Sequence, residues 1–165
     1  MKTIDDILKK IILYKNKKKI VFLIGNTTKA ENNDFYCTPI RHYDQIIVAG
    51  VVVYSEKIAK EIAKIVDGII DYIFVDAEKK ISNKFSLSGE PGNIERAVKE
   101  VVNKSPLISY KANDLTVEAV DAFLSEYHSK EKSGIGGKKI AIIGTGNLGS
   151  KLALKLVERG ATVYL

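Results

Sequence analysis

The chain has 165 residues, of which 45% are apolar and 28% charged, a composition typical of a globular protein. No apolar run approaches the roughly 20 residues of a membrane span, and the N-terminus lacks the apolar core of a signal peptide. The single cysteine, Cys37, excludes an internal disulfide and most zinc sites, so we expect a cytoplasmic protein without membrane contact.

The formal net charge of +6 raises the question of nucleic-acid binding. Much of the excess comes from a lysine cluster near the N-terminus, which comprises Lys9, Lys10, Lys15, Lys17, Lys18 and Lys19. Elsewhere lysines alternate with acids, and no basic motif is interleaved with aromatic residues. A solvated, lysine-rich surface therefore explains the charge better than a nucleic-acid partner.

The first half of the chain alternates helical and strand patterns. Residues Ile4 to Tyr14 place isoleucines and Leu8 on one helix face, and Lys19 to Gly25 is an apolar run typical of a buried strand. The polar stretch from Asn26 to Tyr43 reads as a long loop that reaches toward a substrate. Gln45 to Tyr54 is rich in β-branched residues and predicts a strand in its first half, which Gly50 breaks or ends.

A helix capped by Ser55 and ending near Gly68 leads into a third strand, Ile69 to Asp76. Two strands joined by a helix are most simply a right-handed βαβ unit, so the sequence predicts an α/β domain with a mainly parallel sheet in three layers. We further expect a helix from Asn93 to about Asn103, an edge strand at Leu107 to Tyr110, and a helix from Thr116 with an apolar stripe. That stripe comprises Val117, Val120, Phe123, Leu124 and Tyr127.

The most specific motif lies near the C-terminus. Gly144, Gly146 and Gly149 follow the apolar run Ile140 to Ile143 with G-x-G-x-x-G spacing and open a helical pattern, before a second strand at Ala161 to Leu165. In this context Gly144 makes the tight turn, Gly146 leaves room for a pyrophosphate, and Gly149 lets helix and strand pack closely. The motif predicts the first βαβ unit of a Rossmann domain that binds NAD or NADP through Gly144, Thr145, Gly146, Asn147, Leu148 and Gly149.

The alternative is a glycine turn that binds flavin, another nucleotide or nothing. The acid that binds the adenosine ribose falls about 20 residues after the glycines, beyond Leu165, so the choice between NAD and NADP stays open. We expect the sequence to be a piece of a longer protein. Because one βαβ unit leaves sheet edges and faces uncovered, we also expect a homo-oligomer.

The junction before the glycines resembles a known family. The stretch Lys111-Ala-Asn-Asp-Leu-Thr-Val-Glu, then a polar linker, then Gly136-Gly-Lys-Lys-Ile-Ala-Ile-Ile-Gly is similar to shikimate dehydrogenases and to methylene-tetrahydrofolate or methylene-tetrahydromethanopterin dehydrogenases. The resemblance implies a substrate domain at 1–113, a connecting helix and linker at 114–137, and a dinucleotide-binding domain from 138 to 165. It also implies hydride transfer between the nicotinamide and a small hydroxy or keto acid, or a pterin-bound one-carbon substrate, in a cleft between the domains.

Three polar residues stand at this junction. Lys111 and Asp114 form a pair able to orient a hydroxyl or carbonyl and carry its proton, and Asn113 resembles a substrate-binding residue of the shikimate enzymes. The alternative is that Asp114 or Thr116 merely caps the helix and that Lys111 is solvated.

Four other residues are candidates for a functional site, each with a simpler alternative. Asp76 ends a parallel strand, where ligands bind in open α/β sheets, so we expect it to bind substrate, with a turn residue as the alternative. His42 is more simply an incidental loop residue, His128 a partner for the last helix carbonyls, and Cys37 has no neighbouring histidine to make it a nucleophile. The leading function is an NAD(P)-dependent dehydrogenase with a small-molecule substrate; the alternative is a regulatory protein that binds a dinucleotide without reacting.

Overall fold

The computed structural model describes residues 4–27, 35–81 and 92–165. The chain divides into two compact units, Met1–Tyr110 and Lys111–Leu165. The N-terminal unit contains α1 (Ile4–Ile12), β1 (Lys19–Asn26), β2 (Phe35–Cys37), β3 (Arg41–His42), β4 (Ile46–Val53), α2 (Glu56–Val66), β5 (Tyr72–Asp76), α3 (Ile94–Lys99) and β6 (Leu107–Tyr110). The C-terminal unit contains α4 (Ala112–Tyr127), β7 (Lys139–Ala141), α5 (Asn147–Glu158) and β8 (Thr162–Tyr164).

The N-terminal unit is built on a mainly parallel sheet with the strand order β2-β4-β1-β5-β6, and β3 pairs with β4 beside β2. β1 is parallel to both β4 and β5, and β6 is parallel to β5. The chain passes from β4 through α2 to β5 and from β5 through α3 to β6, so the expected alternation of strand and helix is confirmed. The fold class is α/β.

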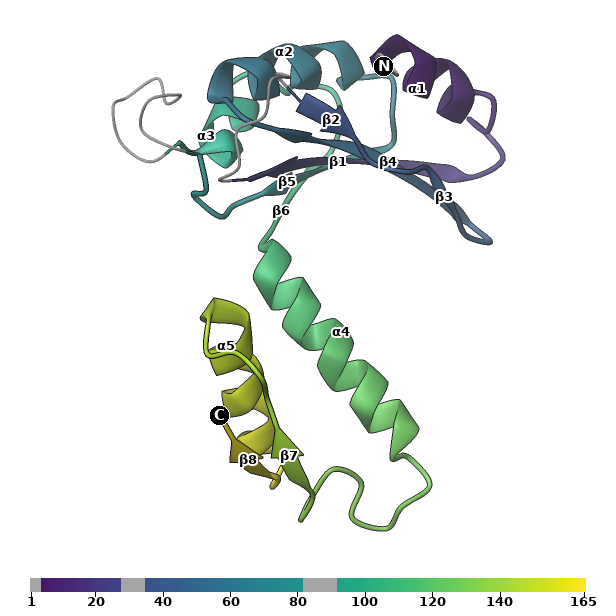
Figure 1. Ribbon diagram of the computed structural model, residues 1–165. Coiled ribbons are helices and arrows are strands. Elements are labelled where there is room, and N and C mark those ends of the chain that lie inside the picture. The colour runs from purple at the N-terminus through teal and green to yellow at the C-terminus, as the bar shows by residue number, and fades with distance from the viewer. Residues whose placement is uncertain (1–3, 28–34, 82–91) are drawn as a thin grey trace. The chain divides into compact units, whose positions relative to one another are not determined.

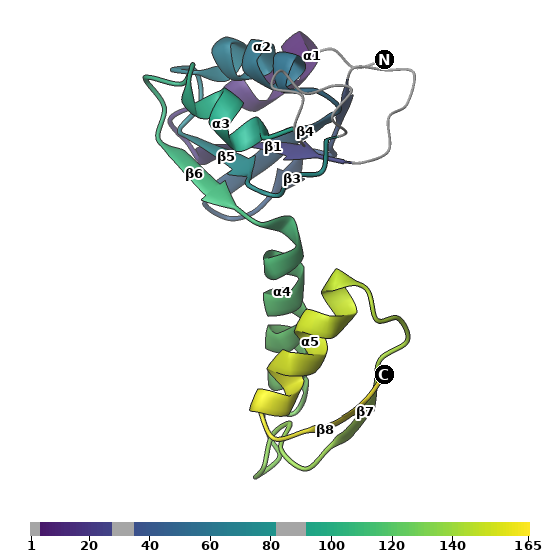
Figure 2. The same cartoon turned by 90° about the vertical axis from the view of Figure 1, so that its left-hand side faces the viewer.

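The helices α1, α2 and α3 gather on one face of this sheet (Figures 1 and 2). On that face every second residue of β1, β4 and β5 is buried, including Ile20, Phe22 and Ile24 of β1, and packs with apolar residues of the three helices in one core. The residues between them, Val21 and Leu23, are only half-buried. The expected third layer has no helix among the described residues of this unit.

Two expectations for the region from Asn26 to Val53 are wrong. We expected one long loop before the second parallel strand, but β2 and β3 lie there and pair antiparallel with β4. Gly50 does not break β4, which continues to Val53. A Cβ at Gly50 would lie 2.4 Å from the carbonyl oxygen of Leu23, so this glycine permits the close approach of β1 and β4.

Side chains at the helix starts satisfy backbone donors as the sequence predicts. Ser55 accepts a hydrogen bond from the Ile58 amide (3.2 Å), and Asn93 accepts one from the Arg96 amide (3.0 Å). The helix that begins at Ile94 ends at Lys99, four residues before the expected end. The side chain of Asp67 accepts hydrogen bonds from the amides of Asn103, Lys104 and Ser105, which fixes the turn that leads into β6.

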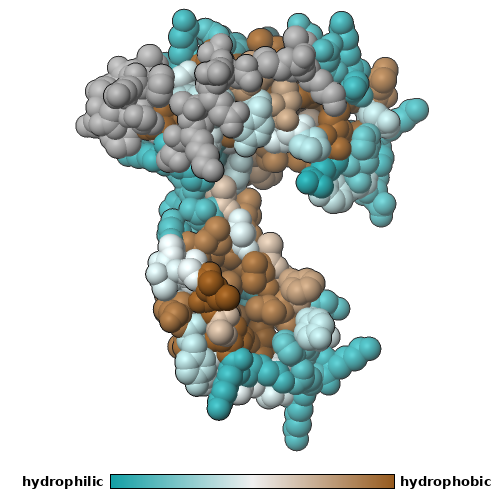
Figure 3. All heavy atoms as spheres, viewed as in Figure 1, coloured by the Kyte–Doolittle hydropathy of each residue, from teal (hydrophilic) through white to brown (hydrophobic). Residues whose placement is uncertain are grey.

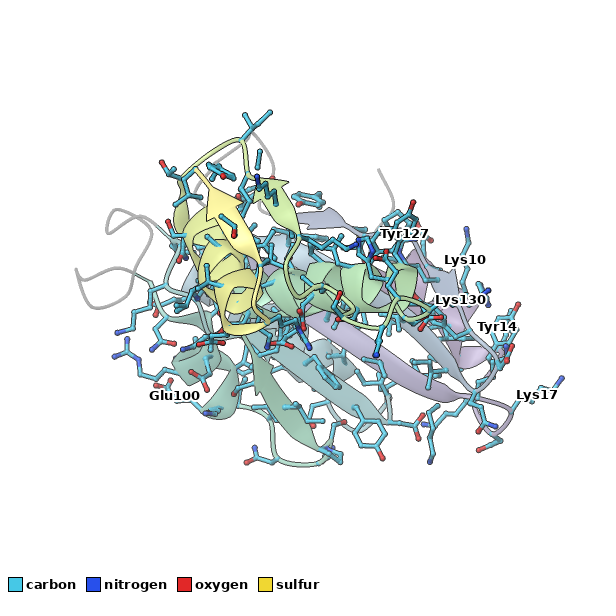
Figure 4. The ribbon with its side chains drawn as sticks, turned by 90° about the horizontal axis from the view of Figure 1, so that it is seen from below. Lys10, Tyr14, Lys17, Glu100, Tyr127 and Lys130 are labelled. Carbon is cyan, nitrogen blue, oxygen red and sulfur yellow. The ribbon has the colours of Figure 1, made fainter. Side chains whose placement is uncertain are left out.

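The lysine cluster lies where α1 leads into β1. Figure 4 shows Lys10, Tyr14 and Lys17 projecting outward at one end of the N-terminal unit, away from Glu100 at the other. The ammonium groups of Lys15 and Lys18 donate to the carbonyl oxygens of Ile69 (2.8 Å) and Tyr43 (2.6 Å). These lysines therefore form a solvated edge with backbone contacts, and the absence of a nucleic-acid partner stays a prediction.

In the C-terminal unit β7 and β8 pair in parallel and α5 connects them, which gives the expected βαβ unit. Leu156 of α5 is fully buried against Ile135 and Ala161. Ile135 belongs to the segment that we predicted to be a linker, so this segment is packed against the unit. Several large apolar side chains of the unit stay exposed, among them Ile143, Leu154, Val157 and Leu165, and Figure 3 shows hydrophobic surface gathered over this unit.

Within the residues that the structure describes, no helix is long and apolar enough to cross a membrane.

Candidate functional site

The glycine turn joins β7 to α5 with the geometry that its spacing predicts. Gly144 has a φ of +113°, a conformation that L-residues with a side chain rarely adopt, so it requires glycine. Gly146 is extended, with φ −68° and ψ −178°, and occupies the N-cap position of α5. The chain therefore turns at Gly144 and enters the helix directly after Gly146.

The other two glycines differ in what surrounds them. A Cβ at Gly149 would lie 1.9 Å from the carbonyl oxygen of Gly144, so only glycine lets the helix approach the turn this closely. A Cβ at Gly146 would have no described atom within 4 Å. Glycine at 146 is thus required neither by its backbone conformation nor by its described neighbours, and the space beside it fits a ligand that approaches the backbone.

The start of α5 favours an anion. The helix has no side-chain hydrogen bond at its N-cap and no acidic residue in its first turn, so the partial positive charge of the helix end is not neutralised from within these residues. The Ser150 hydroxyl donates to the Thr145 carbonyl oxygen (3.1 Å), and the Ser150 amide donates to that of Gly146 (3.0 Å). These two hydrogen bonds stabilise the turn. The amides of Asn147 and Leu148 lie before the first backbone hydrogen bond of the helix. A pyrophosphate suits such a helix end.

A row of three ion pairs, which we call the α4–α5 ladder, joins α4 to α5. It consists of the pairs Asp114–Lys151, Glu118–Lys155 and Asp121–Arg159. Lysine and arginine recur every four residues along α5, so they lie on one helix face, opposite acids spaced four and three residues apart on α4. The helix that we expected to connect two domains is therefore fastened to the helix that follows the glycine turn.

The ladder includes one of the predicted catalytic residues. The Lys151 ammonium donates a hydrogen bond to the Asp114 carboxylate and lowers the pKa of that carboxyl, so Asp114 is held ionised. Both side chains are about half-exposed, at 48% for Asp114 and 41% for Lys151. An ionised carboxylate paired with lysine is a poorer proton acceptor than a solitary one, which favours a structural role for Asp114.

The start of α4 differs from both interpretations of the junction. The helix begins at Ala112, four residues before the expected Thr116, and its N-cap is Lys111, which makes no side-chain capping bond. The Thr116 hydroxyl donates instead to the Ala112 carbonyl oxygen (2.9 Å). Asn113 and Asp114 therefore lie in the first helical turn, and neither Asp114 nor Thr116 is the N-cap.

The apolar stripe predicted for α4 is only partly correct. Val117 is buried, but Phe123 and Tyr127 are 68% and 74% exposed. The most buried polar residue of the helix is Asp121, 3% exposed, whose pKa is lowered chiefly by its hydrogen bonds from the Arg159 guanidinium. Val120 and Leu124 of the stripe are half-buried, so the pattern fails at Phe123 and Tyr127, and it missed Asp121 because charged side chains also make the contact between α4 and Arg159.

Asp76 belongs to a second polar cluster, which we call the β1–β5 edge cluster. It comprises Asn26, Asp76, Glu78, Lys80 and Tyr110, at or just after the carboxyl ends of β1, β5 and β6. Asp76 is 1% exposed and accepts a hydrogen bond from the Glu78 amide (3.0 Å), so it stabilises a turn at the end of β5, and its contact with a substrate stays a prediction. Asn26 and Tyr110 were not predicted as site residues; their position at strand ends was the available signal, but the strand order that brings these ends together was not visible.

The remaining candidates take simple positions. His42 lies in β3 with its ring edge-on to Tyr14, at 5.2 Å between ring centroids. His128 caps the C-terminus of α4 and its Nδ1 contacts the Glu131 carboxylate (2.5 Å). Cys37 lies in β2. Within the described ranges, no group of three or more histidine, cysteine, aspartate or glutamate side chains has the arrangement of a metal site.

Comparison with known proteins gives a distant relationship. Over 87 residues, 52% of the chain, it is 38% identical to glutamyl-tRNA reductase of Thermosipho melanesiensis, and the match spans 20% of the length of that protein. By its name this relative is a reductase that acts on glutamyl-tRNA. No family model matches the chain, and no solved structure matches it.

Proposed function

We propose that this chain contributes the pyrophosphate-binding turn of an NAD(P)-dependent oxidoreductase. The observation that carries the proposal is the open space beside Gly146 at a helix start that lacks an acid and a side-chain cap. The distant relationship to a protein named as a reductase supports the same class of reaction.

In this proposal the dinucleotide is bound by the six residues of the glycine turn, which are Gly144, Thr145, Gly146, Asn147, Leu148 and Gly149. The amides at the start of α5 donate to the pyrophosphate, and Gly146 leaves the backbone accessible to it. Gly149 keeps the turn against the helix. When bound, NAD or NADP supplies the hydride chemistry, and the protein orients the substrate and carries its proton.

The substrate-side roles fall to Lys111, Asp114, Asn113 and Asp76. Lys111 is exposed and has no capping bond, which suits a proton donor or an orienting cation for a small hydroxy or keto compound. Asp114 suits a positioning role through Lys151 better than a role as general base. Asn113 and Asp76 are proposed to contact substrate, and the relative's name adds an aminoacyl-tRNA to the substrates to be tried.

The test is calorimetric titration of NADH and NADPH, with FAD and ATP as comparison nucleotides. We expect the nicotinamide dinucleotides to bind the parent chain and Gly146→Val to lose at least tenfold in affinity, since the valine side chain would occupy the space for the phosphate. Ala141→Val introduces the same final side chain at an exposed position of β7 and serves as control. Equal binding to Gly146→Val and Ala141→Val, with unchanged folding, would reject the proposal.

A second function, dinucleotide sensing without catalysis, is favoured by one observation, the engagement of Asp114 by Lys151. The two functions differ in turnover. Oxidation of NAD(P)H at 340 nm in the presence of hydroxy acids, keto acids, pterin substrates or glutamyl-tRNA would establish the enzyme, and binding without turnover in Lys111→Ala and parent protein alike would establish the sensor. Light scattering tests the proposed homo-oligomer.

A further inference from the structure

The strand order of the N-terminal unit creates a point where loops diverge. After β1 the chain moves to β4 on one side, and after β5 it moves to β6 on the other, while β1 and β5 are neighbours. Connections that leave two adjacent parallel strands in opposite directions open a crevice at the carboxyl ends of those strands, where open α/β sheets bind their ligands. The β1–β5 edge cluster lies at this point.

Side-chain contacts join residues of the cluster that come from different strands. The Asn26 amide group donates to the Glu78 carbonyl oxygen (2.5 Å), and Lys80 contacts the carboxylates of Asp76 (3.4 Å) and Glu78 (2.5 Å). Tyr110 reaches across from β6, because a Cβ at Gly25 of β1 would lie 3.7 Å from its hydroxyl oxygen. Side chains from β1, the segment after β5, and β6 thus converge at one sheet edge.

One acceptor in this cluster is left unsatisfied. Asn26 is 7% exposed, and its Oδ1 is buried without a hydrogen-bond partner among the residues described. A buried acceptor in that condition costs about 1–3 kcal/mol. The other end of the same carboxamide is fixed by its bond to Glu78, so Oδ1 is held in place as an acceptor for an incoming N–H or O–H donor.

The charges of the cluster select among such donors. Asp76 and Glu78 contribute two negative charges and Lys80 one positive charge, so these three side chains carry a net charge of −1. Burial, followed by the charges of Asp76 and Glu78, raises the pKa of Tyr110 to about 12, so its phenol stays neutral. A carboxylate or phosphate would meet repulsion here, whereas an ammonium group offers three N–H donors and a compensating charge.

We propose that the N-terminal unit binds the ammonium group of a small amine at the β1–β5 edge cluster, with Asn26 Oδ1 as acceptor and Asp76 and Glu78 as counter-charges. In this proposal, the ligand that Asp76 contacts carries an ammonium group. It does not require a dinucleotide at the glycine turn, and the two proposals fail separately because the test contains no nucleotide.

The test uses three probes of nearly equal size: 1-amino-2-propanol (cation), propane-1,2-diol (neutral) and lactate (anion). Each is titrated into the full chain at fixed pH 7 and ionic strength, and followed by the amide resonances of Gly25, Asn26, Asp76 and Tyr110. We expect saturable shifts with the amine, at least tenfold weaker binding of the diol, and none with lactate. Magnesium chloride is titrated as a fourth arm.

Two variants locate the site. Asn26→Ala removes the acceptor, and Asp76→Asn removes one charge while keeping an oxygen for the Glu78 amide; each is expected to weaken amine binding at least fivefold. Asp71→Asn makes the same charge change near the amino end of β5 and should bind like the parent. Thermal melts identify any variant that fails to fold. If Asn26→Ala does not fold, the result for Asp76→Asn decides the test.

Each remaining outcome overturns the inference. Indifference to all probes means that Oδ1 is satisfied by a trapped water alone. If lactate binds as well as the amine, the charge of the cluster does not select the ligand. If only magnesium gives saturable shifts, the cluster binds a metal ion. If Asp71→Asn weakens amine binding as much as Asp76→Asn does, the effect comes from the overall charge of the protein.

Discussion

Gly149 offers the sharpest test of the turn geometry, because the same motif contains its control. In Gly149→Ala the new methyl group would lie 1.9 Å from the Gly144 carbonyl oxygen, far inside van der Waals contact. That oxygen belongs to the backbone and cannot rotate away, so the turn and α5 must separate. Overpacking costs 1–3 kcal/mol in general, and the severity of this clash places the expected loss at about 3 kcal/mol.

The matched control is Gly146→Ala. Gly146 has an extended conformation that alanine adopts freely, and its added methyl group meets no described atom within 4 Å. The control should therefore keep the parent stability, or gain roughly 0.4–1 kcal/mol through a less flexible unfolded chain. The two variants make the same chemical change three residues apart with opposite expected results.

Amide hydrogen exchange measures this difference where it occurs, since the two units of the chain need not unfold together. A loss of about 3 kcal/mol corresponds to roughly hundredfold faster exchange in α5 and β7, with little change in β1 and β4. Parent-like exchange in Gly149→Ala would show that the turn relaxes without cost and that the close approach is not required.

Three further predictions concern packing and charge. Gly50→Ala places a methyl group 2.4 Å from the Leu23 carbonyl oxygen and should destabilise the N-terminal unit by about 1–3 kcal/mol in urea unfolding; parent stability would mean that β1 and β4 can separate freely. Asp121→Asn leaves the Arg159 guanidinium without its buried counter-charge and should cost about 1–2 kcal/mol, less than a fully buried pair because the arginine side chain is 45% exposed. Folding lowers the pKa of Asp121 below its ordinary value of 3.8, so its stabilisation is complete above that pH and is lost as pH falls below it. Stability followed from pH 6 to pH 2 should therefore decline less steeply in Asp121→Asn than in the parent chain, and parallel curves would show that the Asp121 carboxylate gains no stabilisation from Arg159.

Much of the secondary structure was predictable because its signals are local. Short apolar runs and β-branched residues identified the strands that became β1, β4 and β5, and the side chains of Ser55 and Asn93 identified two helix starts. The geometry of the glycine turn was predictable, because it depends on backbone conformation at fixed spacing, which only glycine satisfies at Gly144 and Gly149.

The errors arose where a residue's role depends on a partner distant in sequence. Gly50 looked like a strand breaker until β1 was found against it, and the short strands β2 and β3 exist because β4 offers them an edge. The apolar stripe of α4 was misjudged because charged side chains of α5 cover Asp121. Apart from the β3–β4 pairing, each of these contacts joins residues at least ten positions apart, so no local periodicity reports it.

The sequence by itself determined that this protein is α/β and that a glycine turn opens its last helix, because periodicity and glycine conformation are properties of neighbouring residues. Only the tertiary structure decided which polar side chains meet. In the folded chain Asp114 pairs with Lys151. Asn26, Asp76 and Tyr110 lie at one edge of the sheet because β1, β5 and β6 are neighbouring strands. Strand order is fixed by long-range packing of the whole sheet, and the chemistry of the edge follows from that order.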